Sequence, residues 1–386
     1  MAFNYSHMPS KLRLAIRWLA LGLVGVSSFD NALFHLFSLL LLIAVGASMR
    51  WTGSSPLKAA LIETKWIHGA LAAIWATMFI SNMVNGQSDE AWRTMLQFGL
   101  RYWLLFSIFS YLLFTNILTV RLIFAAAITG LAFQFIPFIP AMLDMSIFNS
   151  RFQGMNRNPN TAGFQAAGLT MLSLYLAFYQ KLTRNIRLSL SIILGTLGFI
   201  ALIASGNRGS WVAVFMTSNI FLLFMLPRHP KSVASILAGA AGFVILVLTK
   251  FPQPMARFQK LLDGNSSHRL DVWENALTLW LEKPIFGHGL DLRSAMLENH
   301  FIYHEHNVFI SVFAALGIVG VIAYSAMLGG ILRLGLRYKN YSALLLITMV
   351  LSVGMFAYDF YRSQIFLVHF FILAAVATHY RVLEAD

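Results

Sequence analysis

Long apolar runs separated by short polar stretches follow one another along the whole chain. A helix that crosses a bilayer needs roughly 20 mostly apolar residues. Twelve runs meet this criterion, and they are centred in 12–28, 32–48, 66–84, 95–115, 118–137, 162–180, 188–205, 210–226, 233–249, 307–328, 341–357 and 364–380. The pattern therefore predicts an all-α polytopic integral membrane protein, with about 12 transmembrane helices in a single membrane domain over 1–386.

One connection, residues 250–303, is much longer than the others and lies between the ninth and tenth predicted helices. Its stretch SSHRLDVWENALTLWLEKP predicts an amphipathic helix, which Ser266 or Ser267 can cap and Pro284 ends. The apolar positions that recur at helical spacing are Leu270, Trp273, Leu277 and Trp280. A helix with two tryptophans on one face suits the membrane–water interface.

The composition agrees with a membrane protein, because 58% of the residues are hydrophobic, 11% are charged and the mean hydropathy is +0.69. A water-soluble domain of this length does not carry so few charges. The absence of cysteine excludes a disulfide framework, a thiolate metal site and a cysteine nucleophile. Lys11, Arg13 and Arg17 precede an apolar run as in a signal peptide, but no small-x-small cleavage site follows. We therefore interpret this run as the first transmembrane helix.

Lysine and arginine residues concentrate in alternate connections, which predicts the orientation of the chain. With the N-terminus inside, the inner segments hold Lys11, Arg13, Arg17, Arg50, Lys58, Lys65, Arg121, Lys181, Arg184, Arg187, Arg228, Lys231, Arg333, Arg337, Lys339 and Arg381. The acids on that side are Glu63, Glu384 and Asp386. Both termini are thus predicted to be cytoplasmic, and the net charge of +13 faces anionic membrane lipid rather than nucleic acid.

Polar residues gather in four predicted outer segments and one smaller cluster. These are SRFQGMNRNPNTAG (150–163) with Arg151 and Arg157, SGNRGSW (205–211) with Arg208, SSHRLDVWENA with Arg269, HEHN (304–307), and Asp359 with Arg362 in the last outer loop. Arginines at helix ends are commonly snorkelling anchors, and Asp359 with Arg362 has the spacing of a local ion pair. Guanidinium groups from several loops also suit bidentate binding of phosphate, which predicts an anionic lipid-linked substrate at the outer leaflet.

The HEHN stretch is a poor metal site, because His304 and His306 point roughly 200° apart on a helix. The sequence has no DxD triplet and no Gly-x-x-x-x-Gly-Lys loop, so we expect no metal, no cofactor and no nucleotide. A histidine at a helix end suits acid–base work, although it can also simply cap the helix. Gly317 and Gly320 are predicted to let a neighbouring helix approach closely and so to fix His306 against the bundle.

Together these motifs resemble the O-antigen ligase and polymerase superfamily of bacterial envelope glycosyltransferases. The ligase pattern is a histidine, then Asn, Ser or Gln, nine residues, Gly, two residues, and Gly, Thr or Tyr. It is matched by His306-Asn307, Gly317 and Gly320. The superfamily's R…W…P..G.G element resembles Arg269, Trp273, Pro284, Gly287 and Gly289, its short-loop arginine resembles Arg208, and RFQGMNRNPNTAG resembles its outer loop before a central helix. The motifs cover roughly 150–325, and His304 lies outside the pattern.

The resemblance implies a GT-C type architecture and a metal-independent, inverting transfer of a complete O-antigen polysaccharide. The donor is undecaprenyl diphosphate-linked O-antigen, the acceptor is a sugar hydroxyl of lipid A–core, and the site faces the periplasm at the bacterial inner membrane. It implies catalytic roles for His306 as general base and for Arg208 and Arg269 on the diphosphate. We expect further substrate contacts from Arg151, Arg157, Asn307, Asp359 and Arg362.

Other functions remain open at this stage. Within the superfamily these are an O-antigen polymerase and a protein O-oligosaccharyltransferase, and the histidine motif favours the ligase. A polysaccharide or ion transporter is the alternative from another class, for which we expect ionisable residues deep in several helices. The charges of this chain lie mostly at the outer helix ends, and Arg101 is the main exception.

Overall fold

The computed structural model is all-helical over the residues that it describes, which are 8–27, 31–52, 54–178, 183–264, 269–291, 307–357 and 364–379. Each of the twelve predicted segments coincides with a helix. Among the described residues, eight helices are long and apolar enough to cross a membrane, and Ala343–Met355 and Phe366–Ala377 are shorter apolar helices. The polytopic all-α class is confirmed, whereas the count of twelve spans is not.

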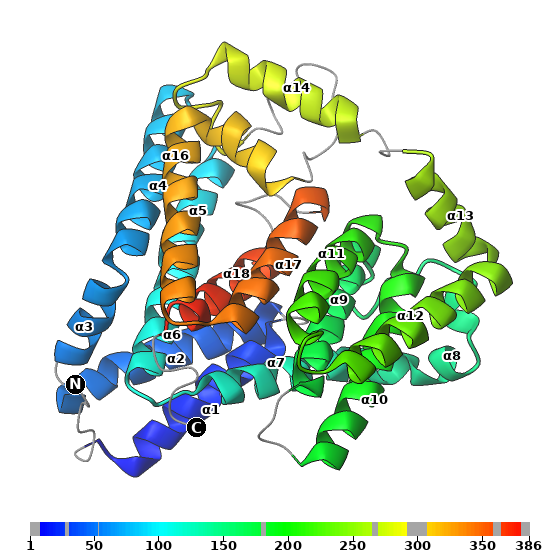
Figure 1. The fold of residues 1–386 in the computed structure, drawn as a ribbon. Helices are drawn as coiled ribbons and strands as arrows, with labels where there is room; N and C mark the ends of the chain where they lie inside the picture. Colours follow the sequence, from blue (N-terminus) through cyan, green and yellow to red (C-terminus); the bar gives the residue numbers. More distant parts are fainter. Residues whose placement is uncertain are drawn as a thin grey trace. The chain divides into compact units, whose positions relative to one another are not determined.

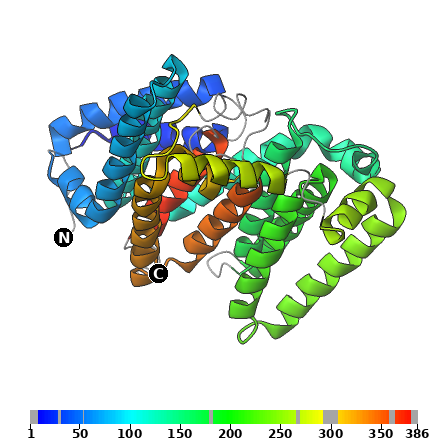
Figure 2. The same cartoon turned by 90° about the horizontal axis from the view of Figure 1, so that it is seen from above.

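The chain divides into two compact units, and each is described by itself. Unit 1 comprises Met1–Ala126, His268–Ile347 and Ala357–Asp386. Its helices are α1 (Ser10–Val26), α2 (Asn31–Thr52), α3 (Ser55–Glu63), α4 (Lys65–Val84), α5 (Asp89–Gln97), the π-helix η1 (Phe98–Trp103), α6 (Leu104–Phe114), α14 (Arg269–Glu282), α16 (Val308–Arg337) and α18 (Gln364–Ala377). Within it, α4 and α16 run side by side, and α14 lies across one end of α16 (Figure 1; Figure 2 shows the α4–α16 pair from above).

Unit 2 comprises Ala127–Ser267 and Thr348–Phe356. It contains the 3₁₀ turns η2 (Ile136–Phe138) and η3 (Ser146–Phe148), and the helices α8 (Ile139–Leu143), α9 (Pro159–Ala177), α10 (Arg184–Ser205), α11 (Arg208–Met225), α12 (Pro230–Lys250) and α13 (Pro252–Leu262). The unit boundaries fall inside α7 (Val120–Phe135) and α17 (Tyr341–Ala357). Helices α9 and α10 pack closely, because a Cβ on Gly198 would lie only 2.9 Å from the backbone nitrogen of Thr170.

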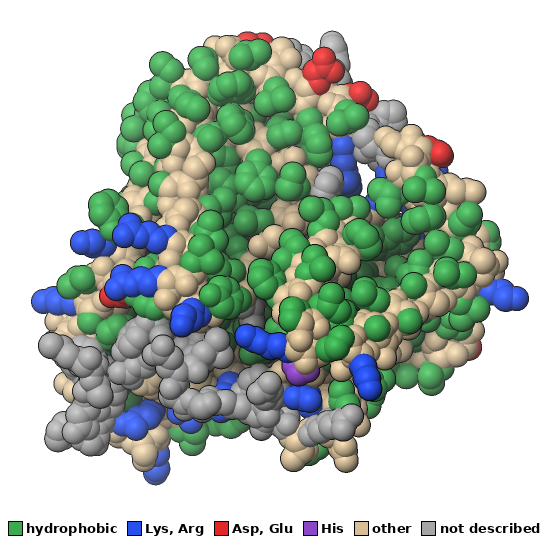
Figure 3. Space-filling view, in the orientation of Figure 1, with side chains coloured by type: hydrophobic (Ala, Val, Ile, Leu, Met, Phe, Trp, Pro, Cys, Tyr) green, Lys and Arg blue, Asp and Glu red, His purple; other side chains and the backbone are tan. Residues whose placement is uncertain are grey.

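Apolar side chains cover much of the face shown in Figure 3. Helix α12 is the clearest case, since only 11% of its apolar window is buried. Its Ile245 and Leu246 are 62% and 47% exposed. A helix that is apolar on all sides and largely uncovered by protein is stable when lipid covers it, so the exposed apolar surface agrees with the membrane assignment.

Candidate functional site

A two-residue connection between α10 and α11 positions Arg208. Helix α10 ends at Ser205, and Gly206 adopts the left-handed conformation (φ 61°) that commonly ends a helix. The side chain of Asn207 then caps α11 by accepting a hydrogen bond from the backbone N–H of Ser210 at 3.3 Å. Arg208 is consequently the first residue of α11, in agreement with the short loop predicted from the sequence.

Arg151 is fixed against this connection by hydrogen bonds. Its Nε donates to the carbonyl of Ser205 at 2.9 Å, and its Nη2 donates to Oδ1 of Asn160 at 3.2 Å. Nδ2 of Asn207 donates to the carbonyl of Asn160 at 3.2 Å. The predicted outer segments that carry Arg151 and Arg208 therefore meet within unit 2.

A third arginine, Arg257 of α13, lies beside them, and we define Arg151, Arg208 and Arg257 as the arginine cluster. A Cβ on Gly206 would lie 3.4 Å from Cγ of Arg257 and 3.7 Å from Cγ of Arg151, so both side chains flank this glycine. Nη1 of Arg208 donates to the carbonyl of Lys260 at 2.9 Å, and the charges of Arg208 and Arg257 repel each other. Like charges held this close favour an anion between them.

Two other predicted arginines lie at or just before the start of a helix. Arg157 is exposed in the turn before α9, with a φ of 50°, and Asn158 caps α9 by accepting hydrogen bonds from the backbone of Asn160 and Thr161. Arg269 is the first residue of α14 and is partly buried. Arg269 belongs to unit 1, whereas the arginine cluster belongs to unit 2.

Helix α14 forms where the sequence predicts an amphipathic helix. The helix ends at Glu282, before Pro284 as expected, and its buried face consists of Val272, Ala276 and Leu279. This face packs against Ala314 and Ile310 of α16. The predicted apolar positions Leu270 and Leu277 are 58% and 39% exposed, which leaves them available to the membrane interface. The spacing of the large apolar residues identified the helix, and the small Ala276 lies at its packing contact with α16.

Helix α16 is broken at Gly317, whose φ and ψ are 63° and −163°. The segment PIFGHG (284–289) fills this break with hydrogen bonds. The N–H groups of His288 and Gly289 donate to the carbonyls of Ala314 and Ala315, each at 2.9 Å. In return, the N–H of Ile318 donates to the carbonyl of Pro284 at 2.9 Å. Backbone groups that the break leaves without helical partners are thereby satisfied.

Glycines allow this close contact between α16 and the PIFGHG segment. A Cβ on Gly317 would overlap the carbonyl oxygen of Ile285, and one on Gly287 would lie 2.6 Å from the carbonyl oxygen of Ala315. The prediction that Gly317 and Gly320 admit a neighbouring helix is therefore wrong: Gly317 admits an extended segment, and a Cβ on Gly320 would meet the preceding turn of its own helix. Asn307 of the ligase-type motif caps this broken helix, and Gly317 and Gly320 lie on it.

Polar side chains at the end of α4, which are not among the predicted site residues, hold the PIFGHG segment and the residues after it. Oδ1 of Asn82 accepts a hydrogen bond from the N–H of Leu290 at 3.1 Å. Gln87 accepts from the N–H of Asp291 at 2.7 Å and donates to the carbonyl of His288 at 3.0 Å. Further bonds run from Ser81 to Ala315, from Asn85 to Gly287 and from Lys283 to Asn85. The signal in the sequence is the density of amides and serines in SNMVNGQS (81–88).

Asn307, predicted to contact substrate, caps the start of α16. Its Oδ1 accepts hydrogen bonds from the backbone N–H groups of Phe309 and Ile310, at 2.9 Å and 3.1 Å. The residue is 4% exposed. The amide oxygen therefore stabilises the helix end that follows His306 in the sequence.

Three predicted site residues lie outside the described residues, namely His306, Asp359 and Arg362, and so do His304 and Glu305 beside His306. Their roles stay predictions. Among the residues that the structure describes, no group of three or more histidine or acidic side chains is placed to hold a metal ion. The expectation of a metal-free site likewise stays a prediction.

His288 of the PIFGHG segment is buried, with 8% exposure. Its Nε2 lies 2.6 Å from the carbonyl oxygen of Leu279, to which it donates. Burial lowers the pKa of His288 below its ordinary 6.5, the hydrogen bond to Leu279 opposes this shift, Lys283 lowers the pKa further, and Glu282 raises it. His288 is therefore neutral at pH 7.

Acidification below about pH 6.5 is expected to destabilise the protein through His288. The unfolded chain takes up this proton at a higher pH than the folded chain, so stability falls as the pH drops through 6.5 and levels off below the lowered folded pKa. Melting temperatures of the purified protein between pH 8 and pH 5 measure this effect. His288→Gln keeps an N–H donor for Leu279 without titrating, so its melting temperature should fall less over this range. An equal fall in both proteins would contradict the assignment.

The fold and these contacts define a polytopic α-helical membrane protein with an arginine cluster at a helix connection and a helix broken by a glycine motif. The O-antigen ligase family model matches residues 193–325 of the chain. This segment contains Arg208, Arg257, α14, the PIFGHG segment and Gly317. Residues 193–325 are thus similar to the O-antigen ligase family, in agreement with the resemblance deduced from the motifs.

Two curated proteins illustrate the relationship. The chain is similar to the teichuronic acid biosynthesis protein TuaE of Bacillus subtilis, with 27% identity over 155 residues, which are 36% of this chain and 32% of TuaE. It is also similar to the O-antigen ligase of Pseudomonas aeruginosa, with 28% identity over 171 residues, which are 44% of this chain and 39% of that ligase. The matches span less than half of the length of these relatives.

Proposed function

We propose that this protein transfers a complete O-antigen polysaccharide from undecaprenyl diphosphate to a sugar hydroxyl of lipid A–core. The observation that carries the proposal is the arginine cluster, because three guanidinium groups suit a diphosphate better than a neutral sugar. The similarity of residues 193–325 to the O-antigen ligase family supports the same reaction class. The reaction would take place at the periplasmic face of the inner membrane, with both termini in the cytoplasm.

In the proposed reaction the acceptor hydroxyl attacks the anomeric carbon while the bond from that carbon to the diphosphate oxygen breaks. His306 takes the hydroxyl proton, and the bond electrons leave with the diphosphate. Arg151, Arg208 and Arg257 would hold this anion and stabilise its growing charge, a task that a metal ion performs in many transferases. A single displacement of this kind inverts the anomeric centre.

Four further residues belong to the proposal as substrate contacts, namely Arg157, Arg269, Asp359 and Arg362. Arg269 would assist on the diphosphate from the start of α14. Asn307, by capping α16, would set the position of the backbone that leads to His306. No cofactor or nucleotide is needed, because a prenyl diphosphate is already an activated leaving group.

Complementation of a Gram-negative strain that lacks its own ligase tests the proposal. The wild-type chain is expected to restore the lipopolysaccharide ladder on a gel, and His306→Ala is expected to abolish it because the acceptor hydroxyl loses its base. His304→Ala is the matched control two residues away and should restore the ladder. A ladder of wild-type intensity from a normally expressed His306→Ala protein would exclude the role of His306 as general base.

A further inference from the structure

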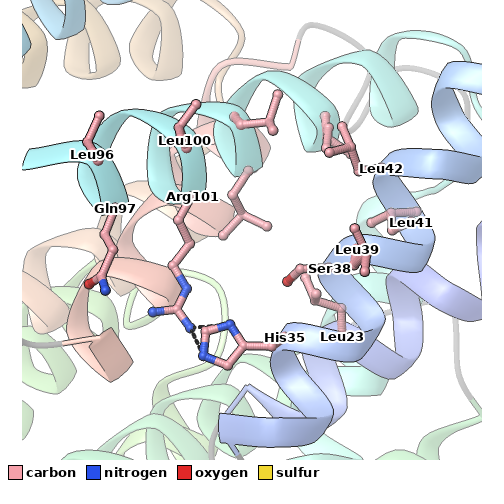
Figure 4. A pocket seen from close by; sticks show the side chains of 13 residues that line it. Leu23, His35, Ser38, Leu39, Leu41, Leu42, Leu96, Gln97, Leu100 and Arg101 are labelled. Atoms are coloured by element: carbon pink, nitrogen blue, oxygen red, sulfur yellow. Dashed lines mark hydrogen bonds between the residues drawn. The ribbon is translucent and has the colours of Figure 1, made fainter. Parts of the chain in front are cut away.

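A cavity of about 340 Å³ lies within unit 1, between α2 and the span that contains α5, η1 and α6 (Figure 4). Leucines provide most of its lining, and its polar members are His35, Ser38, Gln97 and Arg101. The volume is at the lower end of the range for ligand sites. No step of the proposed transfer reaction uses this cavity.

Arg101 is the unusual member of the lining, because it lies inside the candidate membrane span Asp89–Phe114, about one turn after α5 ends at Gln97. Its Nη2 is 2.6 Å from Nε2 and 2.8 Å from Nδ1 of His35. A guanidinium group only donates, so the accepting ring nitrogen carries no proton and His35 contributes no opposite charge. The guanidinium carbon also lies 5.0 Å and 5.7 Å from the ring centroids of Phe34 and Tyr102.

The environment of Arg101 favours an anionic ligand from outside the protein. None of the described side chains that line the cavity is acidic. Aromatic and neutral imidazole contacts offset part of the cost of an arginine inside a bilayer, but they do not neutralise it. Phosphate is the anion that the guanidinium fork binds in a bidentate manner.

The rest of the cavity suits a hydrocarbon chain. Leu39, Leu96 and Leu100 are 56%, 46% and 70% exposed, so this side of the cavity opens toward the membrane interior. A ligand that fits both parts has a phosphate head and an apolar chain. Phospholipids of the bilayer have this chemistry and surround the protein at concentrations far above those of any carrier lipid.

We propose that this cavity binds an anionic phospholipid, with its phosphate on Arg101 and one acyl chain along the leucines of α2, α5 and η1. The site is separate from the arginine cluster and does not depend on the proposed transfer reaction. Basic pockets between membrane helices are suited to such headgroups.

Melting temperatures in nanodiscs of phosphatidylcholine, with or without phosphatidylglycerol, test this site. Phosphatidylglycerol is expected to raise the melting temperature of the wild-type protein, and native mass spectrometry should detect retained phosphatidylglycerol. Arg101→Gln should remove the phosphatidylglycerol-specific rise and lower retention by about tenfold, since one charge-assisted contact is lost. Arg93→Gln, an exposed arginine of the same span, is the matched control and should keep both signals. If Arg101 only made contacts within the protein, Arg101→Gln would change the melting temperature equally in both kinds of nanodisc.

A second variant tests the contact with the acyl chain of the lipid separately from the contact with its phosphate. Leu39→Trp fills the apolar part of the cavity and should also reduce phosphatidylglycerol retention, while inorganic phosphate added to phosphatidylcholine discs should not raise the melting temperature. The proposal is overturned if Arg101→Gln and Leu39→Trp both retain the wild-type response. It is also overturned if inorganic phosphate alone reproduces the rise, or if a polyprenyl phosphate binds and phosphatidylglycerol does not.

Discussion

Arg208→Ala is expected to slow polysaccharide transfer by about 100- to 1,000-fold, the loss typical of removing one donor that stabilises developing charge. Arg208 begins α11 near Arg257, and both Arg257 and Arg151 lie beside Gly206. Arg257→Ala should therefore reduce the rate in the same way. Arg208→Lys should lie between alanine and wild type, because lysine keeps the charge but not the planar fork. Initial rates of transfer from a lipid-linked donor by purified protein measure these effects.

Arg228→Ala is the matched control for this series. Arg228 is exposed and follows the opposite end of α11, so its loss should leave the rate unchanged. Melting temperatures of all variants are required, because Arg208 also donates to the carbonyl of Lys260 and helps to hold α13. Wild-type rates from folded Arg208→Ala and Arg257→Ala proteins would show that the arginine cluster does not bind the diphosphate.

Gly317→Ala is expected to be the most destabilising single methyl addition on α16. The left-handed conformation of Gly317 costs an alanine about 1–3 kcal/mol, and the new Cβ would overlap the carbonyl oxygen of Ile285. Relief of this overlap requires the PIFGHG segment to leave the break, which uncovers backbone groups inside a membrane helix. The melting temperature of the purified protein should fall by several degrees, and transfer should be lost with it.

Gly329→Ala on the same helix is the control, because nothing lies within 4 Å of its added Cβ. Alanine has the higher helix propensity, so this change should be neutral or should stabilise the protein by up to about 1 kcal/mol. If Gly317→Ala melted at the same temperature as Gly329→Ala, the break in α16 would not be a constrained feature of the fold.

The all-helical membrane class could be predicted from the sequence because long apolar runs mark helices that can cross a bilayer, although the count of twelve spans is not confirmed. All twelve predicted segments are helices, and the amphipathic helix α14 was also predicted. The break in α16 could not be predicted, since VFAALGIVGVIAYS reads as a continuous apolar helix. Only the contact with a segment about 30 residues earlier in the chain reveals why Gly317 leaves the helical conformation.

The charged residues of the candidate site could be predicted in part from the sequence. Arg151 and Arg208 were identified because arginines in short outer loops are conspicuous, and the structure brings them to one helix connection. Arg257 was missed because it lies in the long connection, where nothing in the local pattern distinguishes it from Lys250 or Lys260. The amides at the end of α4 were missed because neutral side chains carry no charge signal, and their partners lie about 200 residues away.

The most direct test of the central claim is a reaction of the purified protein with undecaprenyl diphosphate-linked O-antigen and lipid A–core in buffer that contains EDTA. Mass spectrometry of the products distinguishes the possible transfers. We expect the whole polysaccharide to be joined to lipid A–core with release of undecaprenyl diphosphate. Polysaccharide that instead lengthens on the carrier while lipid A–core stays unmodified, or transfer that requires an added divalent ion, would contradict the proposed reaction.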